Sequence, residues 1–327
     1  MMKAEILSLL RERGDYVSGQ ELCEHFQVSR TAVWKAVNQL KKEGYRIQAV
    51  QNKGYLLEAE DEVFGQNELE SRMDTKWAGH PLSFYSTINS TNLRAKQDAD
   101  NGAPEGALVV ADMQTAGRGR RGRTWDSPAG KNVYFTLILK PDYVPDKASM
   151  VTLVMAMAVA EGIRSTCGAE TGIKWPNDIV INGKKVCGIL TEMSAEQGYI
   201  HHVVIGVGIN VGRQEFAPEI ATRAASLEGE CGKRVPKAGL VANIMKAFEK
   251  YYEVFRKTTD LSLLMEDYNA LLVNMDREVR VLDPGGEYTG VSRGINETGE
   301  LLVELPEGGL SRVYSGEVSV RGIYGYI

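Results

Sequence analysis

The segment from Gln114 to Gly130, QTAGRGRRGRTWDSPAG, restricts what this 327-residue chain can form more than any other stretch. Four arginines and three glycines lie between Gly117 and Arg123. Such a segment is too cationic for a core, but glycine backbone can approach an anion closely while guanidinium groups bind it through charge-assisted hydrogen bonds. We therefore predict a mobile basic lid between strands at 107–112 and 132–139, ordered when an anionic ligand fills it.

Two nucleotide-binding patterns fit this loop by letters alone. Its three glycines match G-x-G-x-x-G, and residues 117–124 match the Walker pattern with Arg123 in place of its lysine. Both motifs require a helix directly after the loop, because the helix N-terminus holds the phosphate. Residues 125–130 contain a proline and a glycine and predict no such helix, so we disfavour both motifs. A solvated basic loop without a ligand is the remaining alternative.

The composition is that of an ordinary globular protein, with 43% hydrophobic residues and enough length for one large domain or two to three smaller ones. The net charge of −5 means that nucleic-acid contact requires a local basic surface. The four cysteines and four histidines are scattered without ligand spacing, which predicts neither a disulfide framework nor a zinc site. We find no signal-peptide pattern and no apolar run of membrane-spanning length, and we expect a cytoplasmic protein without membrane contact.

The N-terminal region has the pattern of a winged helix-turn-helix. Helices are expected at 3–13, 18–26 and 29–43, the second with a Ser18–Glu21 capping box, followed by a hairpin over 45–57. From Ser29 to Arg46 there are five basic residues and one acidic residue. A charged face on the third helix can be merely solvated, but the tight spacing and the hairpin favour DNA binding. The predicted DNA-contacting residues are Ser29, Arg30, Thr31, Trp34, Lys35, Asn38 and Lys53.

The remainder predicts a central mixed α/β sheet and a small all-β domain, so the fold class is α+β multidomain. An acidic linker at 58–62 precedes the centre, in which Ser90 and Thr91 are expected to cap a helix over 92–99. Asn182-Gly183 predicts a type I′ hairpin. Short strands separated by Pro-Gly and Gly-Gly turns after Val279 predict a small barrel. The expected domains are 1–62, 63–275 and 276–327.

Several segments of the chain resemble those of bifunctional biotin protein ligases with a repressor domain. The resemblance spans the whole chain and rests on residues 90–92, 114–125, 174–178, 185–190 and 206–210. It implies a biotin/lipoate ligase catalytic fold and a C-terminal SH3-like β-barrel. It also implies that the protein makes biotinyl-5′-AMP from biotin and ATP with Mg²⁺, and transfers biotin to a lysine of a biotin carboxyl carrier domain. The same adenylate would be the corepressor for binding of operator DNA by a homodimer.

The chemistry implied by the resemblance needs a cationic pocket, because a carboxylate must approach the α-phosphate of ATP. The catalytic residues assigned by similarity are Lys185, Arg118, Arg120 and Asp178. The residues assigned to biotin are Ser90, Thr91, Asn92, Gln114, Gly117, Arg118, Gly119, Arg120, Lys185, Gly188 and Leu190. The residues assigned to ATP and the adenylate are Arg120, Arg123, Trp125, Lys174, Asn177, Asp178, Asn210 and Arg321. No protein cluster is expected to hold a metal, since Mg²⁺ would arrive with ATP.

Two other functions stay open at this stage. One is a ligand-responsive DNA-binding regulator without catalysis, which retention of Lys185 and the arginine loop argues against. The other is a lipoate or octanoate ligase, which the DNA-binding domain and the segment 174–178 disfavour. The resemblance further suggests that residues 213–224 form a second loop over the adenylate.

Overall fold

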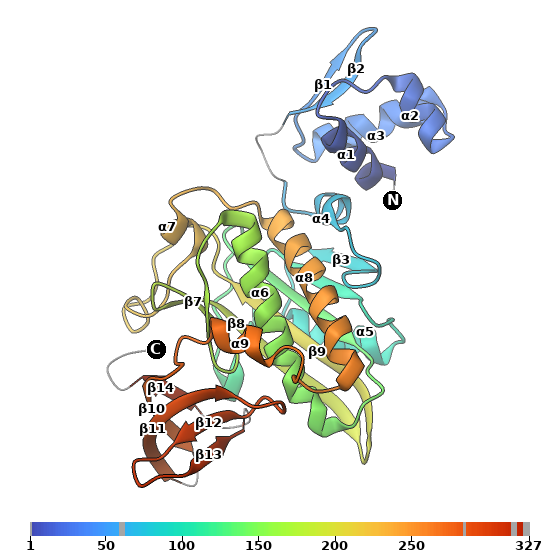
Figure 1. Cartoon of the computed structure of the whole chain (residues 1–327). Helices are drawn as coiled ribbons and strands as arrows, with labels where there is room; N and C mark the ends of the chain where they lie inside the picture. The colour runs from blue at the N-terminus through green and yellow to red at the C-terminus, as the bar shows by residue number, and fades with distance from the viewer. Residues whose placement is uncertain (1, 59–62, 284–285, 315–318, 323–327) are drawn as a thin grey trace. The chain divides into compact units, whose positions relative to one another are not determined.

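The structure is a computed structural model that describes residues 2–58, 63–283, 286–314 and 319–322 (Figure 1). Of the acidic linker expected at 58–62, all but Glu58 lies outside these residues. The chain divides into two compact units, one of Met1–Asp74 with Pro236–Ala242 and one of Thr75–Val235 with Asn243–Ile327.

The first unit has the predicted order of three helices and a hairpin. Its elements are α1 (Met2–Arg13), α2 (Gly19–Phe26), α3 (Arg30–Lys42), β1 (Ile47–Val50), β2 (Gly54–Leu57) and α4 (Gln66–Arg72). The Ser18 hydroxyl accepts from the Glu21 N–H at 3.0 Å, and Ser29 caps α3 in the same way. Only half of the expected capping box forms, because the Glu21 carboxylate accepts from Arg13 instead.

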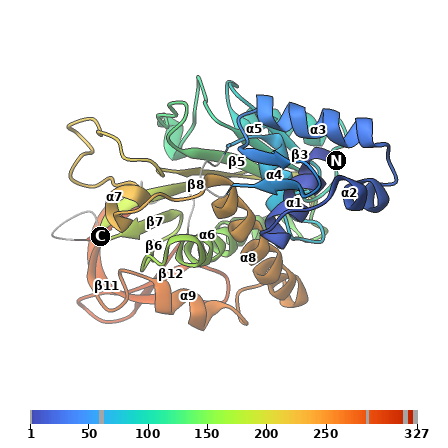
Figure 2. The ribbon, with the colours of Figure 1, turned by 90° about the horizontal axis from the view of Figure 1, so that it is seen from above.

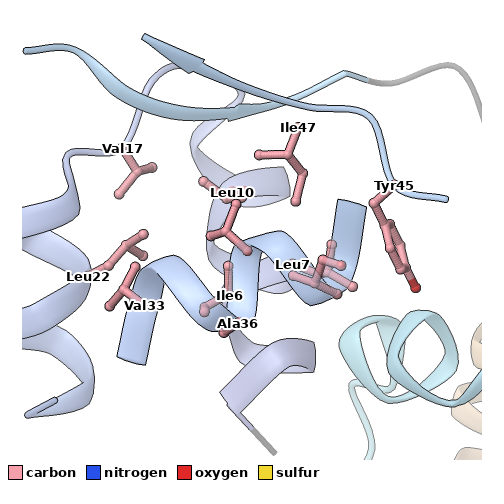
Figure 3. Packing of buried hydrophobic residues seen from close by; sticks show 11 residues of the cluster. Ile6, Leu7, Leu10, Val17, Leu22, Val33, Ala36, Tyr45 and Ile47 are labelled. Atoms are coloured by element: carbon pink, nitrogen blue, oxygen red, sulfur yellow. The ribbon is translucent and has the colours of Figure 1, made fainter. Parts of the chain in front are cut away.

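The apolar faces of these helices meet in one core. The four α3 residues that recur at helical spacing are all buried there, which explains why the charged residues of α3 lie on the other side. Figure 3 shows how the side chains from α1, α2, α3 and the hairpin point toward one another. The buried set is Ile6, Leu7, Leu10, Val17, Leu22, Val33, Ala36, Val37, Leu40, Tyr45 and Ile47.

The second unit is built on a seven-stranded mixed sheet in the order β3-β4-β5-β9-β8-β7-β6. The strands are β3 (Leu82–Tyr85), β4 (Leu108–Ala111), β5 (Val133–Leu139), β6 (Gly172–Lys174), β7 (Asp178–Ile181), β8 (Lys184–Glu196) and β9 (Tyr199–Ile209). Only β3 and β4 pair in parallel among these strands as described. The predicted turn joins β7 to β8, with Asn182 at φ 49° and Gly183 at φ 76° as a type I′ turn requires.

Helices cover both faces of this sheet. α5 (Thr91–Asp100) lies on one face, and α6 (Val151–Cys167) and α8 (Lys237–Thr258) lie on the other (Figure 2). Gly162 lets α6 approach α8, since a Cβ there would be 2.4 Å from Ile244. Tyr252 is buried in α8, whereas the adjacent Tyr251 is only half-buried and donates to Glu161.

One described helical stretch, Pro145–Cys167, is long and apolar enough to cross a membrane by length and composition, and 72% of its apolar window is buried inside the protein. It consists of the 3₁₀ turn η2 (Pro145–Met150) followed by α6. Its apolar character follows from packing on the sheet, since a helix that is apolar all round is typical of a core.

The C-terminal strands form a five-stranded antiparallel sheet in the order β13-β12-β11-β10-β14. They are β10 (Glu278–Asp283), β11 (Gly286–Ile295), β12 (Leu301–Glu304), β13 (Leu310–Val313) and β14 (Ser319–Gly322). The pairing of the described residues is that of an open sheet, and closure into an SH3-like barrel stays a prediction. The Trp175 indole donates to the Gly299 carbonyl at 3.1 Å, which ties this sheet to the segment 174–178.

Candidate active site and nucleic-acid interface

Three glycines on neighbouring strands form the floor of a pocket. Gly188 of β8 pairs with Gly208 of β9, and Gly206 lies two residues before Gly208 on the same face. A Cβ at Gly206 would be 2.0 Å from Asn92 Oδ1, and one at Gly208 would be 2.6 Å from Trp125 Nε1. Asn92 and Trp125 therefore approach the strand closely at Gly206 and Gly208, and any larger residue at either position would displace these side chains.

The pocket above this floor brings together residues from four parts of the chain: the start of α5, the basic segment 114–130, the segment 174–178, and the strands β8 and β9. Its lining includes most of the predicted site. The lining residues are Ser90, Thr91, Asn92, Gln114, Arg118, Gly119, Arg120, Trp125, Asn177, Lys185, Gly188, Ile189, Leu190, Gly206, Val207 and Gly208. Sequence reasoning had not assigned Ile189, Gly206, Val207 or Gly208 to a ligand.

Six predicted residues lie outside this lining. Gly117 is buried beneath the loop, where a Cβ would meet the Trp125 carbonyl at 2.3 Å. Arg123 is exposed, Lys174 is buried at the end of β6, and Asp178 lies next to the lining through Lys185. Asn210 is buried and donates to the Ala225 carbonyl at 3.1 Å. Arg321 belongs to β14, and its side chain lies outside the described residues.

The start of α5 is held by a glutamine and not by its own serine. Ser90 occupies the N-cap position but makes no side-chain capping bond, contrary to expectation. Gln114 Oε1 accepts instead from the Thr91 N–H at 2.9 Å and lies 3.1 Å from the Thr91 hydroxyl. Gln114 Nε2 donates to Ser127. Because the Thr91 N–H can only donate, this bond fixes which end of the Gln114 amide faces the helix, and the Ser90 hydroxyl is left to the pocket.

A second anchor orients Asn92. Its Nδ2 donates to Glu192 Oε2 at 2.8 Å, and Glu192 Oε1 also accepts from Lys96 at 2.6 Å. Thr136 lies 2.7 Å from Asn92 Oδ1. Burial raises the pKa of Glu192, but the hydrogen bonds from Lys96 and Asn92 outweigh it and hold the pKa below its ordinary value. The carboxylate is thus ionised at neutral pH, accepts only, and fixes the Asn92 amide.

Sequence reasoning missed Glu192, Lys96 and Thr136. From the sequence, Glu192 is a charged residue of a strand and Lys96 a charged residue of a helix, and both could face solvent. Thr136 is one residue of a buried strand. Their partners lie 44 to 100 residues away in the chain. The one feature of the sequence that could have pointed to these residues is Glu192 itself, a charged residue four positions after Gly188 in the same strand.

Lys185 lies at the centre of the cationic part of the pocket. Its ammonium pairs with Asp178 at 2.5 Å and lies 5.3 Å from the centre of the Trp125 ring. Its backbone N–H donates to the Arg223 carbonyl at 2.8 Å, and its carbonyl accepts from Ala225 at 2.9 Å. These backbone bonds hold the lysine in place while its side chain can exchange partners.

Arg120 is the half-buried arginine of the basic loop. It donates to Asn177 Oδ1 at 2.8 Å, which joins the loop to the segment 174–178. Burial lowers the pKa of Arg120, and Asp178 partly offsets this effect. A guanidinium remains protonated under such a shift, so the desolvated charge is available to a phosphate.

The basic loop is folded as a short turn and not as extended chain. Gly119 donates to the Arg123 carbonyl at 2.7 Å, and the 3₁₀ turn η1 (Arg120–Gly122) closes it. Trp125 donates to the Gly117 carbonyl at 2.9 Å. As predicted, no α-helix follows the loop in the described structure, which excludes both nucleotide-binding motifs as drawn from the sequence. Whether a ligand orders the lid stays a prediction.

The predicted DNA-contacting residues lie together in the first unit. Ser29, Arg30, Thr31, Trp34, Lys35 and Lys53 are exposed, and Asn38 is half-buried. Trp34 is 57% exposed, which is unusual for so large a side chain on a helix whose other face is core. Lys53 at the hairpin tip lies over the Tyr16 ring. The Ser29 hydroxyl accepts a hydrogen bond from the Ala32 N–H as the N-cap of α3. Ser29 is therefore better suited to contact the DNA backbone than to read a base edge.

No group of three or more His, Cys, Asp or Glu side chains suited to a metal occurs in the described part of the chain. This geometry defines a class: a biotin/lipoate-type protein ligase fold with an N-terminal helix-turn-helix domain. Residues 84–210 match the model of the "Biotin/lipoate A/B protein ligase family". Residues 3–56 match the model "HTH domain", and residues 275–321 match the model "Biotin protein ligase C terminal domain".

The chain belongs to the family of bifunctional ligase/repressor BirA proteins. It is 40% identical over 324 residues to "Bifunctional ligase/repressor BirA" of Bacillus subtilis, with 98% of each chain covered. It is 32% identical to the "Biotin--[acetyl-CoA-carboxylase] ligase" of Paracoccus denitrificans, over 67% of this chain and 92% of the relative. The biotin protein ligase of Aquifex aeolicus, solved with biotin and ATP, superposes with a TM-score of 0.67 at 29% identity, covering 74% of this chain and 99% of the other.

Proposed function

We propose that this protein is an ATP-dependent biotin–[biotin carboxyl carrier protein] ligase and a biotinyl-5′-AMP-responsive transcriptional repressor. The observation that carries the proposal is the single pocket in which a polar cluster from α5 and Gln114 adjoins Lys185, Arg118 and Arg120. A neutral ureido ring needs fixed donors and acceptors, and a carboxylate approaching a phosphate needs positive charge. The pocket supplies both, side by side.

In the first step a biotin carboxylate oxygen attacks the α-phosphorus of ATP and pyrophosphate leaves, which yields biotinyl-5′-AMP. Lys185 binds the carboxylate and α-phosphate, while Arg118 and Arg120 stabilise charge on the departing pyrophosphate. Trp125 covers the adenine, with Arg123, Lys174, Asn177, Asn210 and Arg321 also near the nucleotide. Mg²⁺ bound with ATP would supply further charge neutralisation.

In the second step the acceptor lysine amine attacks the acyl carbon and AMP leaves. Asp178 is ion-paired with Lys185 at 2.5 Å, so its carboxylate is engaged while the lysine side chain stays in place. When the adenylate phosphate draws Lys185 away, the Asp178 carboxylate loses this ion pair and can accept the proton of the incoming amine.

This role predicts that Asp178→Asn slows single-turnover transfer of biotin from preformed adenylate by about 10²-fold or more. An unchanged transfer rate in Asp178→Asn would exclude the role. Asp126→Asn, which changes an exposed aspartate of the basic segment 114–130, serves as the control.

The overall activity is tested by incubating the protein with ATP, an acceptor domain, and either biotin or lipoate. We expect pyrophosphate release and the mass of one biotinyl group on the acceptor, with biotin only. Modification with lipoate instead would identify a lipoate ligase. Binding of biotin without pyrophosphate release would identify a regulator without catalysis.

Glu192→Gln is expected to raise the KM for biotin about tenfold with a smaller change in kcat, because an amide can donate as well as accept and no longer fixes Asn92. The carboxylate's contribution to stability is complete above its unfolded pKa and is lost as the pH falls through the lowered folded pKa. Initial rates over a biotin series measure the effect, with Glu196→Gln, exposed on the same strand, as control. An unaltered KM would show that Asn92 needs no such anchor.

For the first unit, we infer binding of operator DNA through α3 and the hairpin tip. If about five phosphates are neutralised per protomer, log K falls with log salt at a slope of about −4.5. Lys35→Ala should reduce the magnitude of this slope by about 0.9, whereas Lys3→Ala, whose side chain pairs with Glu43, should not change it. A slope near zero in a titration by fluorescence anisotropy would remove the DNA-binding role.

We further propose three domains, a winged helix-turn-helix DNA-binding domain at 1–62, a catalytic ligase domain at 63–275 and an SH3-like β-barrel at 276–327, and that residues 213–224 order over the adenylate. The protein would act in the cytoplasm, where ATP and the carboxyl carrier domain are present. A two-fold operator would be bound by a homodimer, since dimers match two-fold sites.

A further inference from the structure

Two cysteines that are far apart in the sequence lie next to each other in the second unit. Cys167 is the last residue of α6, and Cys231 is the last residue of α7 (Leu227–Cys231). Their sulfur atoms are 3.3 Å apart although the residues are 64 positions apart in the chain. Both thiols are free in the structure. A disulfide has an S–S distance of about 2.05 Å, so closure needs a sulfur movement of roughly 1.3 Å.

The two thiols differ in access, as a reactive pair requires. Cys231 is half-buried and open to a small oxidant, and Cys167 is buried behind it. Burial, together with the contact to Cys167, raises the pKa of Cys231 to about 11, with Glu230 adding to this and Lys233 opposing it. Little thiolate is present at neutral pH, so oxidation at this pair is a slow response to sustained oxidant.

The start of α7 is coupled through the backbone to the active site. Leu227 donates to the Asn210 carbonyl at 2.9 Å and Glu228 donates to Val211 at 2.9 Å. Two residues earlier, Ala225 pairs with Lys185. The segment 213–224 is exposed over most of its length and leads into α7. A covalent bond at Cys231, the last residue of α7, therefore restrains the C-terminal end of this segment.

We propose that Cys167 and Cys231 form an intramolecular disulfide when the protein meets hydrogen peroxide, and that this bond restrains α7 and the segment before it. The Cys231 thiolate attacks the O–O bond, which gives a sulfenic acid and one water after proton transfer. The Cys167 sulfur then attacks the Cys231 sulfur, and hydroxide leaves as a second water with the Cys167 proton. Two thiols are oxidised by two electrons in total, and the peroxide is reduced.

The test treats the full-length protein with hydrogen peroxide, blocks remaining thiols, and digests with trypsin. We expect the peptides 165–174 and 224–233 to appear linked, with the mass of their sum less two hydrogens, and to separate on addition of dithiothreitol. Cys231→Ser should yield no linked pair, with melting of its circular dichroism signal as the check on folding. Sulfinic or sulfonic acids at these positions in place of the link, or a link between two protein molecules, overturns the proposal.

The restraint is measured separately by limited trypsin digestion of the native protein after the peroxide is removed. Cleavage after Arg223 is expected to slow at least threefold in the oxidised protein and to recover with dithiothreitol, while cleavage after Arg123 in the basic loop stays unchanged. Equal rates after Arg223 in both forms would show that the disulfide forms without restraining the segment. Neither readout depends on ligase activity, so the result stands apart from the proposed function.

Discussion

Replacing Lys185 with methionine is expected to slow formation of biotinyl-5′-AMP by about 10²- to 10³-fold, a loss typical for removal of one group that stabilises developing charge. Methionine keeps the length of the side chain and its contact with Trp125, so the change removes charge more than shape. The strand position of residue 185 is held by backbone bonds to Arg223 and Ala225, which the substitution leaves intact. Pyrophosphate release under saturating ATP and biotin measures the effect.

The matched control is Lys184→Met, the neighbouring lysine on β8, whose side chain leaves the strand on the opposite side. It should retain nearly full activity. Removing Lys185 also removes its ion pair with Asp178 in a partly buried site, so a thermal melt must accompany the assay. Adenylate formation at the native rate by a folded Lys185→Met protein would contradict the role given to this lysine.

Replacing Glu68 with alanine is expected to lower the free energy of local unfolding of α1 by about 3 kcal/mol. Glu68 is only 2% exposed, yet its carboxylate accepts from Arg11 at 2.8 and 2.9 Å and from Arg72 at 2.5 Å. Burial lowers the pKa of Arg11 and Glu68 opposes this, so loss of the carboxylate leaves two guanidinium groups close together without their shared anion. The contact joins α1 to α4 within the first unit.

Hydrogen exchange in the folded protein, followed by mass spectrometry, measures this effect, since α1 amides should exchange about 100-fold faster for such a loss. Glu68→Gln should fall between the alanine variant and the native protein because it keeps the hydrogen bonds without the charge. The control is Glu70→Ala on the same helix, whose carboxylate accepts from Gln66, and it should change exchange little. If the α1 amides of Glu68→Ala and Glu68→Gln exchange as slowly as those of the control variant, the buried ion pair does not stabilise the packing of α1 on α4.

Much of the local structure followed from the sequence because it is decided within a few residues. Ser18 and Ser29 cap their helices because a short polar side chain reaches an N–H three residues on. The Asn182-Gly183 turn formed because only such residues accept positive φ at both positions. The glycine and arginine content of the basic loop by itself excluded a core element, and the structure has a turn there.

The candidate site was only partly predictable. Its members were named through resemblance to a family whose motifs are continuous in sequence, and most of them line one pocket. The sequence carried no sign that Gln114 caps α5, that Glu192 orients Asn92, or that Trp175 reaches Gly299. Each of these contacts joins residues 23 to 124 positions apart, and such pairs form only after the strands have taken their order.

The sequence by itself determined the three N-terminal helices, the Asn182-Gly183 turn, the charged face of α3 and the composition of the basic loop, since propensity, capping and periodicity act over single turns of chain. The tertiary structure alone decided which polar groups are paired. It places Asp178 against Lys185, and it brings Cys167 to within 3.3 Å of Cys231. The reason is physical: burial and hydrogen bonding depend on which elements pack together, and strand order β3-β4-β5-β9-β8-β7-β6 is not a local property of any segment.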